Sequence, residues 1–329
     1  MKSLILSRNG LVILAMLLIF IFADGLGAFE KASFSLYDKI RMLGASPVST
    51  VLVVAIDEHT IANIDTYPIL NNTHLRLIGN LISAGVELVG YAGLPSLNSV
   101  NVSSGDTLAS PIMDGQQLGA LASEIRKKGL VVAGIPFVAL SKNDLTQRAL
   151  PAYLLQNSLS NGHSIKLSSA RPAYPLPESA GGPASHYASI LVDNDNGKTV
   201  RSVPLFVEAG GRLIPSLALQ MYLHARNLSL ADVNISTANR VTVADSPLAS
   251  DQKLQVWPYF YPASSYDNHL VEVISYHDVL HGAVAEGFLD GKIVLLGATA
   301  RGLTPAVRTP VESSVPPVMV AANTLASML

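Results

Sequence analysis

The most constraining feature of this sequence is an apolar run near its start. Every residue from Leu11 to Phe22 is apolar, and the run continues to Phe29 with Asp24 as its only charged residue. A helix needs about 20 apolar residues to cross a bilayer. The sequence therefore predicts a transmembrane helix over residues 11–29.

Basic residues before this run predict its orientation. Lys2 and Arg8 precede it, and Lys and Arg beside a membrane helix favour the cytoplasmic side. We expect residues 1–10 in the cytoplasm, a signal anchor at 11–29, and the remainder outside the inner membrane. A cleaved signal peptide is the alternative, because a short apolar run followed by the small residues of 23–25 also fits a cleavage signal.

A juxtamembrane helix is expected over residues 30–46, ending before Pro47. Its apolar residues recur at spacings of three and form one stripe, which consists of Phe34, Tyr37, Ile40 and Leu43. The stripe can pack on the rest of the chain or on a second copy. We expect a homodimer.

Beyond Pro47, short apolar strands alternate with amphipathic helices. The expected strands are STVLVVAID, VELVGYAG, LVVAGIPF and, much later, GKIVLLGAT. Helices are expected over 73–84 and 115–128, each followed by a glycine, and over 317–329. This alternation predicts an α/β fold, with three layers and a mostly parallel sheet between flanking helices. Residues 47–329 are expected to form one extracytoplasmic domain.

An inserted β-hairpin is expected beside the sheet. The segment YASILVDNDNGKTVRSVPLFVEAGGRLIP predicts two strands, tight turns and a helix that begins at Pro215.

The chain stops at Leu329 within an apolar helical pattern. We therefore expect the natural protein to continue, with further membrane helices and an output domain.

Composition excludes several classes of protein. Charged residues make up only 14%, and 22 Lys and Arg balance 24 Asp and Glu, so nucleic acid is not an expected partner. Cysteine is absent, which removes disulfides, thiolate nucleophiles and Cys-ligated metals. No Gly-x-Ser-x-Gly elbow is present. No catalytic residue and no cofactor are expected.

Three motifs resemble ligand sites but lack essential residues. HDVLH places His277 and His281 on one helix face around Asp278, yet no third zinc ligand is evident, so a solvated helix face is expected. Residues 193–197 read DNDNG and predict a hairpin turn, because the calcium-loop spacing is wrong. The glycines of 297–302 lack the Lys of a phosphate-binding loop. No metal site is expected.

Charged residues follow two of the expected parallel strands. Asp57 and Glu58 come at the end of one, while Arg301 and Arg308 follow another. Open α/β sheets bind ligands at the carboxyl ends of their strands. These four residues are therefore our candidate ligand contacts, with helix caps and salt links as the other interpretation.

Taken together, several sequence segments resemble the CHASE2 extracytoplasmic sensor family. They run in order after residue 33 and are VLVVAIDE, VDNDNGKTVRSVPL, GGRLIPSLAL, HDVLHG, DGKIVLLGATARGL and AANTLASML, with Thr309-Pro310 before the last. Two stretches depart from the family pattern, at 91–94 and 317–321. Polar positions that could bind a ligand are apolar there.

The resemblance implies a sensory role in a bacterial membrane protein. Such domains receive a small-molecule or envelope signal in the periplasm and pass it to a cytoplasmic cyclase, diguanylate cyclase, phosphodiesterase or kinase. The rival interpretation is a secreted small-molecule-binding protein or hydrolase released by signal cleavage.

Overall fold

The structure is a computed structural model of the chain. It describes residues 50–64, 69, 71–92, 115–140, 150–161, 167, 169–173, 184–191, 199–260 and 271–329. The predicted cytoplasmic segment 1–10, membrane helix 11–29 and juxtamembrane helix 30–46 all lie outside these residues. Among the described residues, no helix combines the length and apolar character needed to span a membrane.

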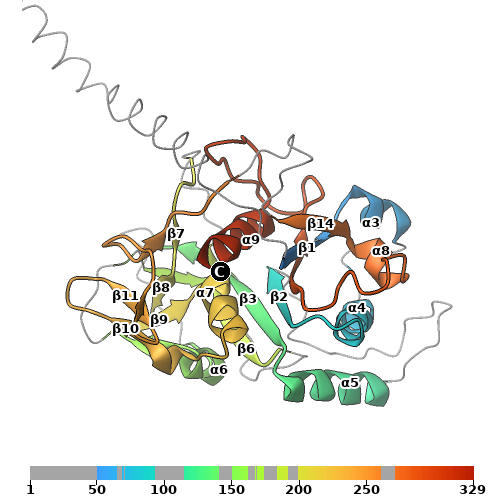
Figure 1. Cartoon of the computed structure of the whole chain (residues 1–329), viewed down its shortest axis with the longest axis horizontal. Helices are drawn as coiled ribbons and strands as arrows, with labels where there is room; N and C mark the ends of the chain where they lie inside the picture. The colour runs from blue at the N-terminus through green and yellow to red at the C-terminus, as the bar shows by residue number, and fades with distance from the viewer. Residues whose placement is uncertain are drawn as a thin grey trace, which may run out of the picture. The chain divides into compact units, whose positions relative to one another are not determined.

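A mostly parallel sheet forms the centre of the described chain (Figure 1). The strand order is β14-β1-β15-β2-β3, and β3 also pairs with β6 in parallel and with the short β5 in antiparallel. The strands are β1 (Val51–Ile56), β2 (Leu88–Ala92), β3 (Val131–Ala139), β5 (Ala170–Pro172), β6 (His186–Leu191), β14 (Glu272–Ser275) and β15 (Ile293–Ala298). The prediction of a mostly parallel sheet is confirmed.

Helices cover both faces of this sheet, which gives the three predicted layers. On one face lie α3 (Glu58–Asn63), α4 (Asn71–Ser83), α5 (Gly115–Lys128) and α8 (Tyr276–Leu280). On the other face, α7 (Leu217–Ala225) and α9 (Pro317–Met328) pack side by side (Figure 1).

Strand β1 shows why both faces are apolar. Its alternate residues Leu52, Val54 and Ile56 belong to the core under α4 and α8, whereas Val51 and Val53 belong to the core under α7 and α9. All six residues of β1 are buried. A strand buried on both sides reads as a continuous apolar run, which is the pattern in its sequence.

Glycines end two helices as predicted. Gly85 follows α4 with φ of +84°, and Gly129 follows α5 with φ of +73°. Beyond Gly85, the N–H of Val86 donates to the carbonyl of Leu81 at 3.1 Å, as in a Schellman cap. These stops return the chain to the sheet for β2 and β3.

A β-hairpin is present beside the sheet, although its position differs from the expectation. Strands β8 (Phe206–Ala209) and β9 (Arg212–Pro215) pair across the Gly210-Gly211 turn. The residues before Ser216 are thus strand rather than helix, so the predicted helix start at Pro215 is wrong. Ser216 caps α7, accepting from the N–H of Leu219 at 3.2 Å. The expected turn at 193–197 lies outside the described residues.

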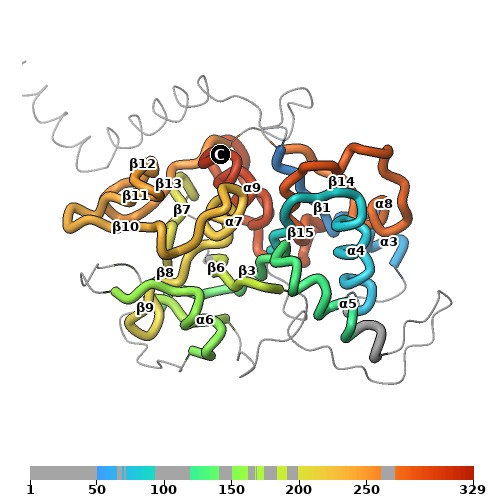
Figure 2. Tube along the Cα trace, turned by 60° about the horizontal axis from the view of Figure 1, so that its bottom comes forward, coloured from blue at the N-terminus to red at the C-terminus, as the bar shows by residue number. Residues whose placement is uncertain are grey.

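Shorter elements complete the part of the chain that is described (Figure 2). Strands β10, β11 and β12 form a small sheet that packs on α7 through a separate apolar cluster. The remaining elements are α6 (Ala152–Gln156), β4 (Leu159–Ser160), β7 (Val203–Pro204), the 3-10 helix η2 (Leu230–Asp232), β10 (Val233–Ile235), β11 (Val241–Val243), β12 (Ser246–Pro247) and β13 (Gln255–Val256).

Candidate functional site

The carboxyl ends of β1, β14 and β15 meet at one edge of the sheet, where Asp57 caps α3. Its Oδ1 accepts from the N–H of Thr60 at 2.8 Å, from the Thr60 hydroxyl at 2.6 Å and from the Ser275 hydroxyl at 3.0 Å. Ser275 is the last residue of β14. Asp57 therefore ties the first turn of α3 to a neighbouring strand, which is a structural role.

These contacts also explain the acidity of Asp57. Partial burial raises the pKa of its carboxyl, but the hydrogen bonds from Thr60 and Ser275 together outweigh that effect. The net pKa lies below the ordinary value. Donors that favour the charged form of a carboxyl produce this shift, so Asp57 is a carboxylate at neutral pH.

Glu58 and Arg301 also meet at this edge. The main-chain N–H of Arg301 donates to Oε1 of Glu58 at 2.9 Å. The N–H groups of Thr299 and Ala300 both donate to the carbonyl of Ile56 at 3.0 Å. The loop after β15 is thus fastened to the end of β1, while the side chain of Arg301 is exposed.

Arg308, the fourth predicted site residue, lies on a different segment. Its carbonyl accepts from the N–H of Val200 at 2.7 Å, and Thr199 is its bridge partner. The structure therefore gathers Asp57, Glu58 and Arg301, and it places Arg308 beside the strand-like stretch at 199–200.

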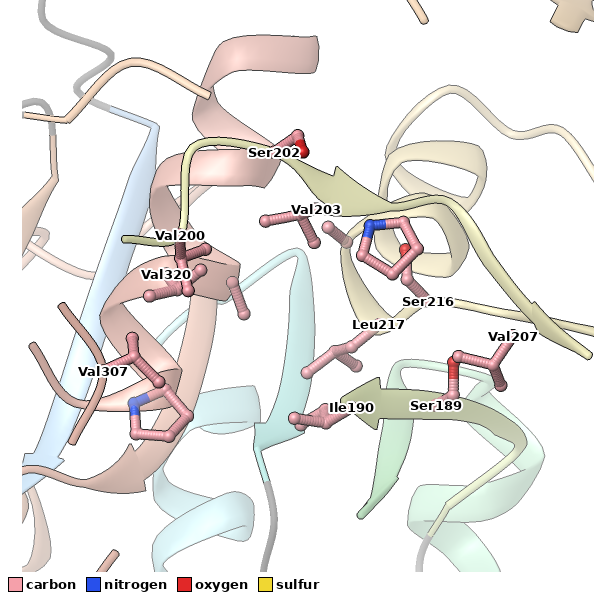
Figure 3. Close-up of a pocket in the computed structure, with 14 residues that line it drawn as sticks. Ser189, Ile190, Val200, Ser202, Val203, Val207, Ser216, Leu217, Val307 and Val320 are labelled. Atoms are coloured by element: carbon pink, nitrogen blue, oxygen red, sulfur yellow. The ribbon is translucent and has the colours of Figure 1, made fainter. Parts of the chain in front are cut away.

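A pocket lies next to that stretch (Figure 3). It sits where the first turns of α7 and α9 approach the end of β6, and its volume is about 120 Å³. The walls are mainly apolar, with Ile190, Val200, Val203, Leu217, Val307 and Val320 among the lining residues. An engineered apolar cavity of roughly 150 Å³ holds benzene. A small, largely apolar molecule therefore matches this pocket.

Three serines line the same pocket, but their hydroxyls already have protein partners. Ser189 donates to a main-chain carbonyl at 3.0 Å, and Ser202 donates to the side chain of Gln255 at 2.7 Å. Ser216 caps α7. The pocket therefore offers little unsatisfied polar surface.

A group of histidines lies beside the Asp57 network. The rings of His59 in α3 and His277 in α8 meet edge to face, with their centroids 4.7 Å apart. Oδ1 of Asp278 is 3.8 Å from Nδ1 of His59 and 3.6 Å from Nδ1 of His277. His281 is exposed, as the prediction of a solvated helix face requires, but His277 is partly buried against His59.

Neither the pocket nor the pairing of His59 with His277 has a signal in the sequence. The pocket residues are small or apolar side chains spread from 189 to 321, and half of them are valines and alanines. His59 and His277 are brought together only because β1 and β14 are neighbours in the sheet. Nothing near either residue in the sequence marks that pairing.

Comparison with known families identifies the chain. The CHASE2 domain model matches residues 12–329, which is nearly the whole length. Neither the curated proteins nor the solved structures gave a significant match. The sequence resemblance is confirmed by this match, and the chain belongs to the CHASE2 domain family, a family of extracytoplasmic sensory domains.

Proposed function

We propose that this chain is the membrane-anchored, periplasmic input domain of a bacterial signalling protein, and that it catalyses no reaction itself. The stimulus would pass to a cytoplasmic cyclase, diguanylate cyclase, phosphodiesterase or kinase. The observation that carries the proposal is the CHASE2 match over residues 12–329. That match includes the apolar run 11–29 almost entirely, which supports an anchor belonging to the domain.

The direction of α9 supports a route for the signal. Val318, in its first turn, lies over Gly297 near the carboxyl end of β15. From there the helix packs along the sheet, in contact with β1, β15 and β2. Helix α9 thus runs back along the sheet toward the edge where β1 begins.

Helix α7 runs alongside in the same direction. Its cap, Ser216, is bridged to Ser189 of β6, and its C-cap residue Arg226 donates to the carbonyl of Leu329 at 3.2 Å. The start of β1 and the end of α9 therefore lie at one edge of the sheet. A shift of α9 relative to β1 is the movement that would carry information toward the membrane.

The pocket at the start of α9 is where we place the stimulus. Pro317, Val320 and Ala321 of α9 line it together with Leu217 and Ala218 of α7. An occupant would contact α9 directly. It would shift the equilibrium between two positions of α9 if it bound one of them more tightly than the other. Ligand contacts by Asp57, Glu58, Arg301 and Arg308 remain a prediction, as does the homodimer.

Filling the pocket tests this proposal. Ala321→Leu should occupy part of the space and change the basal output of the natural protein several-fold at equal membrane level. Ala285→Leu is the matched control, because Ala285 is exposed and lies away from the pocket. Equal output from both variants and the parent protein would contradict a signal that starts in the pocket.

The rival is a secreted binding protein, which the apolar pocket would also suit. N-terminal sequencing of the mature protein separates the two. A chain that keeps residues 1–29 supports the anchor, whereas a chain that begins near residue 26–29 contradicts it.

A further inference from the structure

We propose that His59, His277 and Asp278 form a binding site for a divalent transition-metal ion, with Zn²⁺ as the first candidate. The two imidazoles and one carboxylate offer the nitrogen and oxygen ligands that zinc takes in proteins. No metal site was expected from the sequence, because His277 and His281 lacked a third ligand. The fold supplies that ligand from α3.

The spacing of the ligand atoms suits one ion. Bonds of about 2.0–2.1 Å at tetrahedral angles place ligand atoms roughly 3.4 Å apart. Oδ1 of Asp278 is 3.8 Å and 3.6 Å from the Nδ1 atoms of His59 and His277. One ligand atom from each residue lies within 4.8 Å of the other two.

His277 provides an independent observation. Its Nδ1 atom is buried and has no hydrogen-bond partner among the described residues. Buried polar atoms without a partner are rare in proteins, and a bound ion can satisfy such an atom. This atom faces the carboxylate of Asp278 at a distance too long for a hydrogen bond.

The charge balance points to a cation. Among the described residues, no Lys or Arg lies within ion-pair distance of Asp278. The titratable side chains beside its carboxylate are His59 and His277. A divalent ion would supply the positive charge that no Lys or Arg supplies there, and it would bind the unpartnered Nδ1 of His277. Nδ1 of His59 would exchange its long contact with the Ser275 hydroxyl, at 3.5 Å, for the ion.

The main chain on both sides of the site is held in place. The Thr60 hydroxyl is buried between α3 and α8, where it contacts the Ser275 hydroxyl at 3.1 Å and accepts from the N–H of His277 at 3.3 Å. The main chain that carries the proposed ligands is therefore held in place at the first turns of α3 and α8, which favours a preorganised site. The side chains of His59 and Asp278 are 52% and 40% exposed, so an ion can enter from solvent.

His281 is not among the proposed ligands. Its Nδ1 lies 2.9 Å from the carbonyl of His277 within the same helix, and it serves as the matched control. Water would complete the coordination of an ion held by three protein ligands.

The test is Zn²⁺ titration of the full 329-residue chain, purified in detergent and freed of metal, by calorimetry. We expect one ion per chain, bound more weakly as the pH falls, because metal ligands must be deprotonated to bind. His59→Ala and Asp278→Asn should each weaken binding by at least the roughly 10–100-fold that loss of an outer-shell partner costs. His281→Ala should leave the affinity unchanged.

Substitution of Co²⁺ gives a second readout. A four-coordinate cobalt site should show visible absorption in the parent chain and in His281→Ala, but not in His59→Ala. His59→Ala should retain the melting temperature of the metal-free parent, because the side chain is exposed. Absence of saturable binding in the folded parent, or an affinity that His59→Ala leaves unchanged, would overturn the proposal. These measurements are made on the chain itself, so their outcome does not depend on the proposed sensory role.

Discussion

Replacing Gly297 with alanine should force α9 away from the sheet. A Cβ at this position would lie 2.8 Å from both Cβ and Cγ2 of Val318 and 3.2 Å from Cβ of Ala92. Carbon atoms in proteins pack at about 3.5–4.0 Å. Val318 cannot turn away, because its Cβ is fixed to the helix and its branched side chain prefers one rotamer there. The helix itself has to move by about 1 Å to restore that spacing.

The expected cost follows from overpacking. Inserting a methyl group into a filled core costs about 1–3 kcal/mol. For a domain of this size, about 1 kcal/mol corresponds to a fall of roughly 2–4 °C in melting temperature. Thermal and urea unfolding of the full chain, followed by near-ultraviolet circular dichroism, measure the change.

Gly79→Ala is the matched control. Gly79 lies inside α4, and a Cβ there would meet nothing within 4 Å. This change should stabilise the protein by about 0.5–1 kcal/mol, because alanine favours a helix over glycine. Glycine-to-alanine substitution is thus expected to stabilise the protein at position 79 and to destabilise it at position 297.

A double-mutant cycle tests the named contact. Val318→Ala removes one of the two clashing atoms, so Gly297→Ala should cost less in that background, by at least about 0.5 kcal/mol. A strictly additive double variant, or a Gly297→Ala protein as stable as the parent, would refute the packing of α9 on β15.

Two further predictions concern the polar side chains of Asp57 and His74 and their dependence on pH. Asp57→Ala removes the acceptor for Thr60 and Ser275 and should lower the free energy of unfolding by about 0.5–2 kcal/mol at neutral pH. Because the pKa of Asp57 is lowered in the folded protein, this loss should shrink as the pH falls below about 4. Equal urea midpoints for the parent and the variant at neutral pH would contradict this prediction. Burial lowers the pKa of His74 to about 4, and its Nδ1 lies 3.0 Å from the Tyr276 hydroxyl. As the pH falls, His74 is therefore protonated in the unfolded chain before it is protonated in the folded protein. The free energy of unfolding should fall on this account by up to about 3 kcal/mol between roughly pH 6.5 and 4. His74→Gln should flatten this pH dependence, and parallel pH profiles of stability for the parent and the variant would contradict the prediction.

The local elements were predictable because their signals are local. Strand β1 reads as an apolar run, and Gly85 and Gly129 mark helix ends. The strand order was not predictable. Strand β15 lies between β1 and β2, although it is far from both in the sequence, and no periodicity records which distant strands will pair.

The candidate site shows the same division. Asp57, Glu58 and Arg301 meet at one edge, as parallel strands require. The sequence could not place His59 beside His277, since that contact depends on the pairing of β14 with β1. Apolar pocket walls also carry no chemical signature that distinguishes them from ordinary core.

The proposed function requires the domain to lie outside the cytoplasm on a membrane anchor. Alkaline phosphatase, which is active only outside the cytoplasm, can be fused after Leu329 and expressed in a bacterium. We expect an active enzyme in the membrane fraction, on a chain that keeps residues 1–29. An inactive phosphatase, together with bright fluorescence from green fluorescent protein at the same position, would contradict the extracytoplasmic placement.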